Sequence, residues 1–304
     1  MNLNQQKINQ SQAAAISYGF RQRWADVLVL VKYKLTLTVV ITAVLPYLVV
    51  SQGAFKWSVL LLLGFGGYLV AGAANALNQI LEREYDRNMT RTENRPLAAQ
   101  RMNISEALVI AGFMMLIGIA CLSFIHPLCG LLGMLSLITY SFIYTPLKRF
   151  NTLSVAVGAI PGALPVLIGT IAFEGAITPF GLLLFAFQFL WQFPHFWAIG
   201  WLSFDQYKKA GFKLLPEKND QIDPSLGKNT LLYSLLFVGL VVFGWLTGFY
   251  PMIPAIFILG LTLWYAWKSF RFFKDFDRVT ARKLMFSSFM IMPLIFIILL
   301  ISSL

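Results

Sequence analysis

One segment of the chain carries two carboxylates and an amide at a helical spacing. Asn78, Glu82 and Asp86 are four residues apart, and on a helix this spacing places their side chains along one face. Carboxylate and amide oxygens are hard ligands that suit Mg²⁺, which fills its other positions with water and substrate phosphate. The pattern predicts a magnesium site. Glu84 is an alternative ligand by type, but it points about 160° away from Asp86, so the helical phase favours Glu82.

Arginines with the same spacing follow the acids: Arg83, Arg87, Arg91 and Arg95. Pro96 should end any helix by Asn94 or Arg95. A guanidinium binds two phosphate oxygens at once, so acids followed by arginines fit a metal-bound diphosphate better than a bare cation. A solvated loop whose arginines only follow the membrane topology stays open as the alternative, most of all for Arg83 and Arg87.

Three other polar stretches could complete such a site. They are Tyr144, Lys148 and Arg149; Trp191, His195 and Phe196; and Asp205 and Tyr207. Lys148 is either a second phosphate contact or a lysine that only orients its loop. His195 is a buried structural residue, a haem-iron ligand or a proton carrier, and its sequence neighbours do not decide among these.

The elements that must position these residues are apolar blocks. The 304-residue chain is 58% hydrophobic and 12% charged, about half the charge of a soluble protein, which excludes an ordinary soluble enzyme and a disordered chain. Blocks near 20 residues long can span a membrane as helices, and nine are present, near 27–50, 57–81, 104–124, 127–145, 152–173, 177–201, 230–249, 251–270 and 284–303. They do not alternate, which excludes a barrel. The prediction is an all-α, polytopic bundle of nine transmembrane helices.

The distribution of charge predicts the orientation of this bundle. Of the 24 basic residues, all but Lys56 fall on the side of the N-terminus, which the positive-inside rule makes cytoplasmic. We therefore expect a cytoplasmic N-terminus, a C-terminus on the opposite side and a cavity that opens to the cytoplasm. We further expect a polar cytoplasmic tail over 1–25, without a signal peptide, and one nine-helix domain over 26–304. The net charge of +11 is explained by topology, so nucleic acid is not an expected partner.

From Asn78 to Leu97 the chain follows the pattern N-x₃-E-x₃-D-x₂-M-x-R-T-x₂-R-P-L. In this pattern it resembles the UbiA-type intramembrane prenyltransferases, and among them the branch that farnesylates haem. The family's Y-T-x-L-K-R stands at Tyr144–Arg149 and its W-x₂-P-H-F at Trp191–Phe196. A D-x-Y-x₂-A-G-x₃-L-P run stands at Asp205–Pro216. The likeness covers essentially the whole chain except the N-terminal tail.

The resemblance implies an enzyme of the cell inner membrane that transfers a farnesyl group from farnesyl diphosphate to a vinyl group of haem B, giving haem O. It implies Mg²⁺ on Asn78, Glu82 and Asp86. It places the diphosphate on Arg91, Arg95, Tyr144, Lys148 and Arg149. The haem would lie by His195, Trp191 and Phe196, with Asp205 and Tyr207 as a second polar cluster. Membrane lipid surrounds such a protein, and its product would pass to a haem-modifying enzyme or a haem-copper oxidase.

Three departures from the family pattern matter. Glu82 stands where many members have aspartate, and Tyr33 where a proline is common. Relatives that act on quinone precursors carry a second D-x₃-D cluster, and here that region offers only Asp205 and His195, which leaves the number of magnesium ions open. The alternatives are a prenyltransferase for a quinone-precursor aromatic acceptor, a membrane transporter, and a non-catalytic oxidase assembly protein. A transporter would place its charges near mid-membrane, whereas these acids collect at the cytoplasmic boundary.

Overall fold

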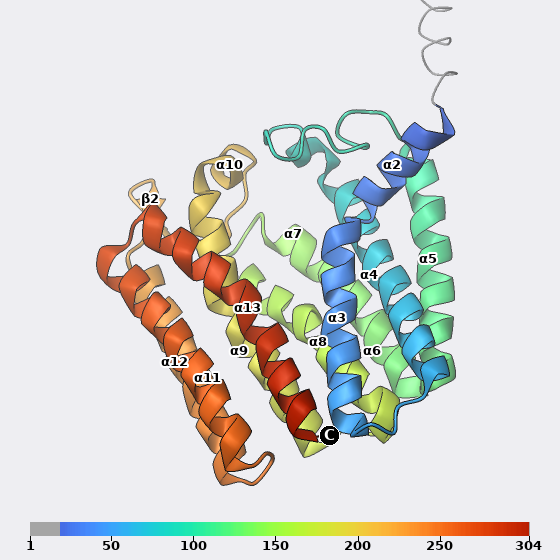
Figure 1. The fold of residues 1–304 in the computed structure, drawn as a ribbon. Coiled ribbons are helices and arrows are strands. Elements are labelled where there is room, and N and C mark those ends of the chain that lie inside the picture. The colour runs from blue at the N-terminus through green and yellow to red at the C-terminus, as the bar shows by residue number, and fades with distance from the viewer. Residues whose placement is uncertain (1–18, 304) are drawn as a thin grey trace, which may run out of the picture.

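The computed structural model describes residues 19–303, so residues 1–18 of the predicted tail lie outside the described part. Within that part the chain is almost entirely helical (Figure 1). The elements are α2 (Phe20–Leu30), α3 (Tyr33–Ser51), α4 (Trp57–Asp86), α5 (Ile104–Ile125), α6 (Pro127–Ile138), the π-helical turn η1 (Thr139–Tyr144), α7 (Thr145–Leu147), α8 (Ser154–Glu174), α9 (Pro179–Leu202), α10 (Phe204–Lys209), β1 (Glu217–Lys218), β2 (Gln221–Ile222), α11 (Ser225–Leu246), α12 (Met252–Asp275) and α13 (Arg278–Ser303). The two short strands pair antiparallel.

Nine segments of the described chain are long and apolar enough to span a membrane, which confirms the predicted all-α bundle and its number of spans. One of the nine is composite, because α6, η1 and α7 continue one another over Pro127–Leu147. The described chain begins with α2 at one end of the bundle, and its C-terminal end lies at the opposite end (Figure 1). The protein is therefore a multi-pass membrane protein.

The spanning helices form two groups, each with its own apolar core. Helices α3, α4, α5, α6 and α8 share one core, and α9, α11, α12 and α13 supply most of the other. Val49 of α3 and Val166 of α8 are buried in the second core, so these two helices join the groups into one bundle. In Figure 1, α3 and α8 lie between α4–α6 on one side and α11–α12 on the other.

The first predicted span, 27–50, is interrupted in the structure. Helix α2 ends at Leu30 and α3 begins at Tyr33, with Lys32 in the left-handed backbone region at φ 48°. A non-glycine residue rarely adopts this conformation, and here a contact with another helix accompanies it. Gln79 of α4 donates from Nε2 to the carbonyl oxygens of Val29 and Leu30, both at 2.8 Å. The bond to Leu30 satisfies a carbonyl that the end of α2 leaves without a helical partner, and Val29 also accepts the backbone N–H of Lys32 at 3.1 Å.

The second span is longer than predicted and ends differently. Helix α4 continues to Asp86, five residues beyond the expected 81, but it does not reach Asn94 or Arg95. The four arginines therefore do not lie on one helix, because Arg83 belongs to α4 whereas residues 87–103 form a connection that folds back. Thr92 donates to the carbonyl of Asp86 at 2.9 Å, and Arg87 donates to that of Ala98 at 3.0 Å. These side-chain bonds take the place of further helical turns.

Candidate active site

Three oxygen-bearing side chains lie buried along the last turns of α4. Asn78, Glu82 and Asp86 expose 1%, 3% and 1% of their surface, and the uninterrupted helix places all three on one face, as their spacing predicts. Glu84 lies on the exposed side, where it pairs with Arg83 and Arg87. Buried charges require partners. The side chains that surround these three residues therefore indicate which kind of ligand the site can bind.

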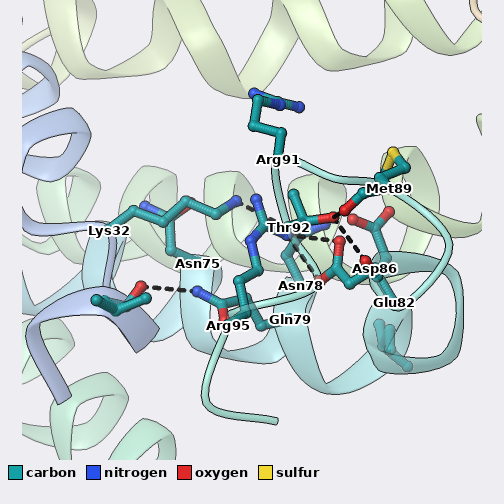
Figure 2. A network of polar contacts seen from close by, with 12 residues as sticks. Lys32, Asn75, Asn78, Gln79, Glu82, Asp86, Met89, Arg91, Thr92 and Arg95 are labelled. Atoms are coloured by element: carbon teal, nitrogen blue, oxygen red, sulfur yellow. Dashed lines mark hydrogen bonds and ion pairs between the residues drawn. The ribbon is translucent and has the colours of Figure 1, made fainter. Parts of the chain in front are cut away.

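Each of the three receives a cationic side chain from a different segment. The pairs are Lys32 with Asn78, Lys148 with Glu82, and Arg95 with Asp86. Lys32 donates from Nζ to Asn78 Oδ1 at 2.8 Å, and Nη1 of Arg95 lies 2.8 and 2.7 Å from the two carboxylate oxygens of Asp86 (Figure 2). The cluster holds three cations and two carboxylates, so it carries one surplus positive charge. An anion is the ligand that such a cluster attracts.

Lys32 is the member of this cluster that the sequence analysis did not single out. Its side chain enters the site because the break between α2 and α3 turns it toward α4. Lys32 lies within the LVKYKLTL stretch of the family resemblance, and a lysine inside an apolar block is a signal that could have identified it.

Lys148 reaches Glu82 from the irregular end of the fourth span. Its ammonium group lies 5.2 Å from the ring centre of Tyr144 and 4.9 Å from that of Phe212. The π-helical turn η1 ends at Tyr144, and turns of this kind recur at functional sites because they redirect side chains. Gly158 of α8 makes room for the Tyr144 ring, since a Cβ at this position would lie 2.7 Å from it.

A second layer of polar contacts holds Asn78 in place. Its Nδ2 donates to the hydroxyl of Thr145 at 3.1 Å, and that hydroxyl donates to the carbonyl of Tyr140 at 2.8 Å. One turn earlier on α4, Asn75 donates to Thr36 at 3.1 Å. Asn75 and Thr145 were not among the predicted site residues. Both are polar groups in apolar spans, which is the signal that could have found them.

The remaining predicted phosphate contacts lie at the edge of the cluster. Arg91 Nη2 is 3.5 Å from the hydroxyl of Tyr207, so this tyrosine does approach the connection after α4. Arg149 donates to the carbonyl of Leu81 at 2.9 Å. Asp205 is exposed on α10 and forms no hydrogen bond or ion pair within residues 19–303. The structure therefore does not bring Asp205 into the site.

His195 lies elsewhere, at the seam between α9 and α13. Its ring stacks on Trp191 at a centroid distance of 5.0 Å and an interplanar angle of 16°, and it meets the edge of Phe289 at 5.2 Å. Nδ1 lies 2.6 Å from Oγ of Ser288. Phe196 is next to it and exposed. None of these contacts involves α4, so the structure does not place His195 in direct contact with the acids.

An apolar cavity lies inside the bundle, and no side chain of the polar cluster is part of its lining. Its lining comes from α3, α4, α5, α6 and α8 and includes Val40, Gly67, Val70, Ala74, Leu137 and Pro165. Ala74 lies one helical turn before Asn78 on the same helix, so one end of the cavity is about one turn of α4 away from the polar cluster. Gly67 lies eleven residues before Asn78, which is about 16 Å along α4. This arrangement suits a molecule with an anionic head and a long apolar chain.

A buried polar cluster one helical turn from an apolar cavity, in a bundle of spanning helices, suits an intramembrane enzyme for lipid-like substrates. The sequence profile of the UbiA prenyltransferase family matches residues 38–292. The chain therefore belongs to this family and is a prenyltransferase.

Sequence relatives carry a more specific name. A protoheme IX farnesyltransferase of Christiangramia forsetii is 42% identical over 84% of this chain and 86% of its own length. One of Flavobacterium johnsoniae is 38% identical over 91% of this chain and 93% of its own length. A human mitochondrial protein with this name is 32% identical over 88% of this chain and 60% of its own length.

Solved structures show the same fold at low sequence identity. A digeranylgeranylglyceryl phosphate synthase superposes with a TM-score of 0.78, at 19% identity, over 93% of this chain and 99% of its own. A UbiA homologue of Archaeoglobus fulgidus, solved with DMAPP and Mg²⁺, superposes with a TM-score of 0.65 at 16% identity, over 90% and 99%. Divalent metal and a prenyl diphosphate therefore occur together in a protein of this fold.

Proposed function

We propose that this protein transfers the farnesyl group of farnesyl diphosphate to a vinyl group of haem B. The observation that carries the proposal is the cluster of Lys32, Arg95 and Lys148 on Asn78, Glu82 and Asp86, one helical turn from an apolar cavity. The names of the sequence relatives support the choice of haem as acceptor.

The residues of the cluster fit a magnesium ion. Among residues 19–303 no group of three His, Cys, Asp or Glu side chains could hold a metal, so the donor set here is two carboxylates and the amide of Asn78. All three oxygen donors are buried and already face cations, and Mg²⁺ prefers such oxygens. When bound by Asn78, Glu82 and Asp86, the ion supplies charge neutralisation to the departing diphosphate.

The charges of this chain also fit the substrate head group. A fully ionised prenyl diphosphate is a trianion, and with one Mg²⁺ dication it adds one net negative charge. The three cations and two carboxylates of the cluster carry one surplus positive charge and so balance a diphosphate with a single metal ion, while Arg91 and Arg149 at the edge add further positive charge. We therefore propose one magnesium site, with Lys32, Arg95 and Lys148 turning to phosphate oxygens and Arg91, Tyr144 and Arg149 at its edge.

The reaction then follows from the positions of the side chains. The cations stabilise the diphosphate as the bond between its oxygen and the first farnesyl carbon breaks. The rings of Tyr140 and Tyr144, 5.4 Å apart, lie beside the cluster and offer aromatic faces to the allylic cation. The terminal vinyl carbon of haem forms the new carbon–carbon bond. Water adds to the resulting cation at the other vinyl carbon and releases a proton, which gives the hydroxyalkyl product.

The haem acceptor requires a second surface on the protein. His195 with Trp191 and Phe196 supplies an imidazole and aromatic faces at the α9–α13 seam. We propose that the porphyrin contacts this surface, while Tyr207, which approaches Arg91, stands nearer the diphosphate end.

The membrane placement completes the proposal. The basic connections lie at the end of the bundle that carries the acids, so we place this end in the cytoplasm, the C-terminus opposite it, and the protein in the cell inner membrane. The proposal keeps 1–25 as a cytoplasmic tail, although 20–25 lie in α2, and 26–304 as one domain. The product would pass to a haem-modifying enzyme or a haem-copper oxidase.

The test is product formation by the purified full-length protein. With farnesyl diphosphate, haem B and Mg²⁺ we expect a farnesylated haem that mass spectrometry identifies. Asp86→Asn should abolish turnover, whereas Glu84→Gln, two residues away on the exposed side of the same helix, should retain it. Equal activity of both variants would contradict the metal site. Prenylation of a hydroxylated aromatic acid in place of haem would contradict the acceptor.

A further inference from the structure

Ser288 of α13 forms two short hydrogen-bond contacts with its hydroxyl oxygen. Oγ donates to the carbonyl of Met285 at 2.5 Å and lies 2.6 Å from Nδ1 of His195. A serine hydroxyl carries one proton, and a carbonyl carries none. If that proton pointed at His195, the oxygens of Ser288 and Met285 would meet at 2.5 Å with no proton between them. The proton therefore belongs to the bond with Met285, and Oγ must accept from His195.

The position of the Ser288 proton determines the tautomer of the His195 imidazole. The ring of His195 packs against Trp191, Phe196 and Phe289 and contacts no carboxylate within residues 19–303. Such surroundings favour the neutral ring over the charged one. A neutral imidazole carries one proton, and the contact with Ser288 requires it on Nδ1. Nε2 therefore carries a lone pair.

Nε2 is also free to meet a ligand. Within the described chain it has no hydrogen-bond partner, and it is not among the fully enclosed side-chain atoms that lack one. Some of its surface is therefore accessible. Metal-binding histidines characteristically donate from one ring nitrogen to an oxygen and bind the metal through the other.

We propose that Ser288 is a positioning residue that keeps Nδ1 of His195 protonated, so that Nε2 binds the iron of the haem substrate. The inference rests on the proposed function and deepens it, because it names the atom that holds the acceptor. The backbone of Ser288 contributes as well, since its carbonyl accepts the indole Nε1–H of Trp191 at 2.9 Å. One residue of α13 thus orients both stacked rings.

The chain offers a direct measurement of the tautomer without haem. It contains two histidines, so ¹⁵N-histidine labelling of a His126→Asn variant leaves only the signals of His195. Asparagine suits this position because His126 caps the start of α6. In His126→Asn we expect a protonated Nδ1 and an unprotonated Nε2. In His126→Asn/Ser288→Ala the hydroxyl no longer keeps the proton on Nδ1, so the two ¹⁵N shifts should exchange or average. The opposite assignment in the Ser288-containing protein would overturn the proposal.

Haem titration of the full-length protein tests the iron contact. Ser288→Ala removes the hydroxyl, and Ser287→Ala is its matched control, because Ser287 donates to the carbonyl of Leu284 at 2.8 Å but does not touch His195. Loss of such an orienting partner weakens metal binding by about 10- to 100-fold, so we expect at least a tenfold rise in the haem Kd for Ser288→Ala and none for Ser287→Ala. The Soret band should indicate a nitrogen ligand, which His195→Gly loses and added imidazole restores.

The outcomes separate this inference from the function on which it rests. If the unaltered protein farnesylates haem but its Soret band shows no nitrogen ligand, or if Ser288→Ala binds haem like Ser287→Ala, the inference alone is wrong. If the unaltered protein binds haem through His195 but forms no farnesylated product, the transfer reaction is wrong. A protein that binds no haem overturns both.

Discussion

The ion pair between Lys148 and Glu82 makes opposite predictions for metal binding and for catalysis. Both side chains are almost fully buried, and they come from residues 66 positions apart in the sequence. Lys148→Met removes the ammonium and leaves the Glu82 carboxylate buried without its partner. Breaking a buried pair by removing one side costs about 3–5 kcal/mol of folding stability. We expect the melting temperature of the purified variant, with a chelator present, to fall by several degrees.

The unpaired carboxylate should then bind added metal more strongly. In the unaltered protein Mg²⁺ must displace Lys148 from Glu82, whereas in Lys148→Met it meets an uncompensated carboxylate. The rise in melting temperature on adding Mg²⁺ should therefore be larger for the variant. Turnover should fall at the same time, because one cation no longer stabilises the departing diphosphate.

Two further variants make this experiment decisive. Glu82→Gln/Lys148→Met buries no unpaired charge, so it should recover most of the lost stability while losing the response to Mg²⁺. Lys213→Met removes an exposed lysine whose backbone N–H donates to the carbonyl of Lys148 at 2.7 Å, and it should behave like the unaltered protein. A Lys148→Met protein with unchanged melting temperature and an unchanged response to Mg²⁺ would refute the reasoning.

Three other substitutions test the rest of the site. Lys32→Met should raise the KM for farnesyl diphosphate about 10- to 100-fold, the value of one charged hydrogen bond, while Lys34→Met should not. Gly67→Phe should raise kcat/KM for geranyl diphosphate relative to farnesyl diphosphate, because a Cβ at Gly67 meets no atom within 4 Å and the new ring can enter the cavity. Gly158→Ala should lower kcat, since its methyl group would displace the Tyr144 ring.

Matched positions give each of these results a control. Gly64 has similar space around it but does not line the cavity, so Gly64→Phe should leave the preference for chain length unchanged. Gly112 meets no neighbouring atom, and Gly112→Ala should retain kcat. Equal effects at Lys32 and Lys34, at Gly67 and Gly64, or at Gly158 and Gly112 would show that the variants act on folding and not on the site.

The parts of the structure that local spacing determines could be predicted from the sequence. The nine spans follow from the length of apolar blocks, and the common face of Asn78, Glu82 and Asp86 follows from helical geometry. The exposed position of Glu84 follows from the same geometry. In each case the information lies within one continuous segment of about 20 residues or fewer.

The parts that depend on distant residues could not be predicted. The end of α2 is stabilised by Gln79, some 50 residues away, and without this contact 27–50 has the pattern of one span. The spacing of the arginines does not show where α4 ends; the helix ends at Asp86, where Thr92 and Arg87 bond back to the chain. His195 lies within α9 and contacts α13, and Asp205 lies exposed on the separate helix α10, so neither meets the acids.

The pairing of every oxygen ligand with a cation predicts that metal and diphosphate bind cooperatively. Without ligands, Arg95 and Lys148 neutralise Asp86 and Glu82. A metal ion alone would release these cations without giving them new partners, and a diphosphate alone would take them from the carboxylates and leave two buried negative charges. Together the two ligands exchange one set of pairs for another.

Inorganic pyrophosphate should therefore raise the affinity of the protein for Mg²⁺. Mg²⁺ should raise the affinity for pyrophosphate by the same factor, typically about 5- to 150-fold. Calorimetric titrations in both orders measure this factor, and two independent affinities would show that the cations do not pass from the acids to the phosphate.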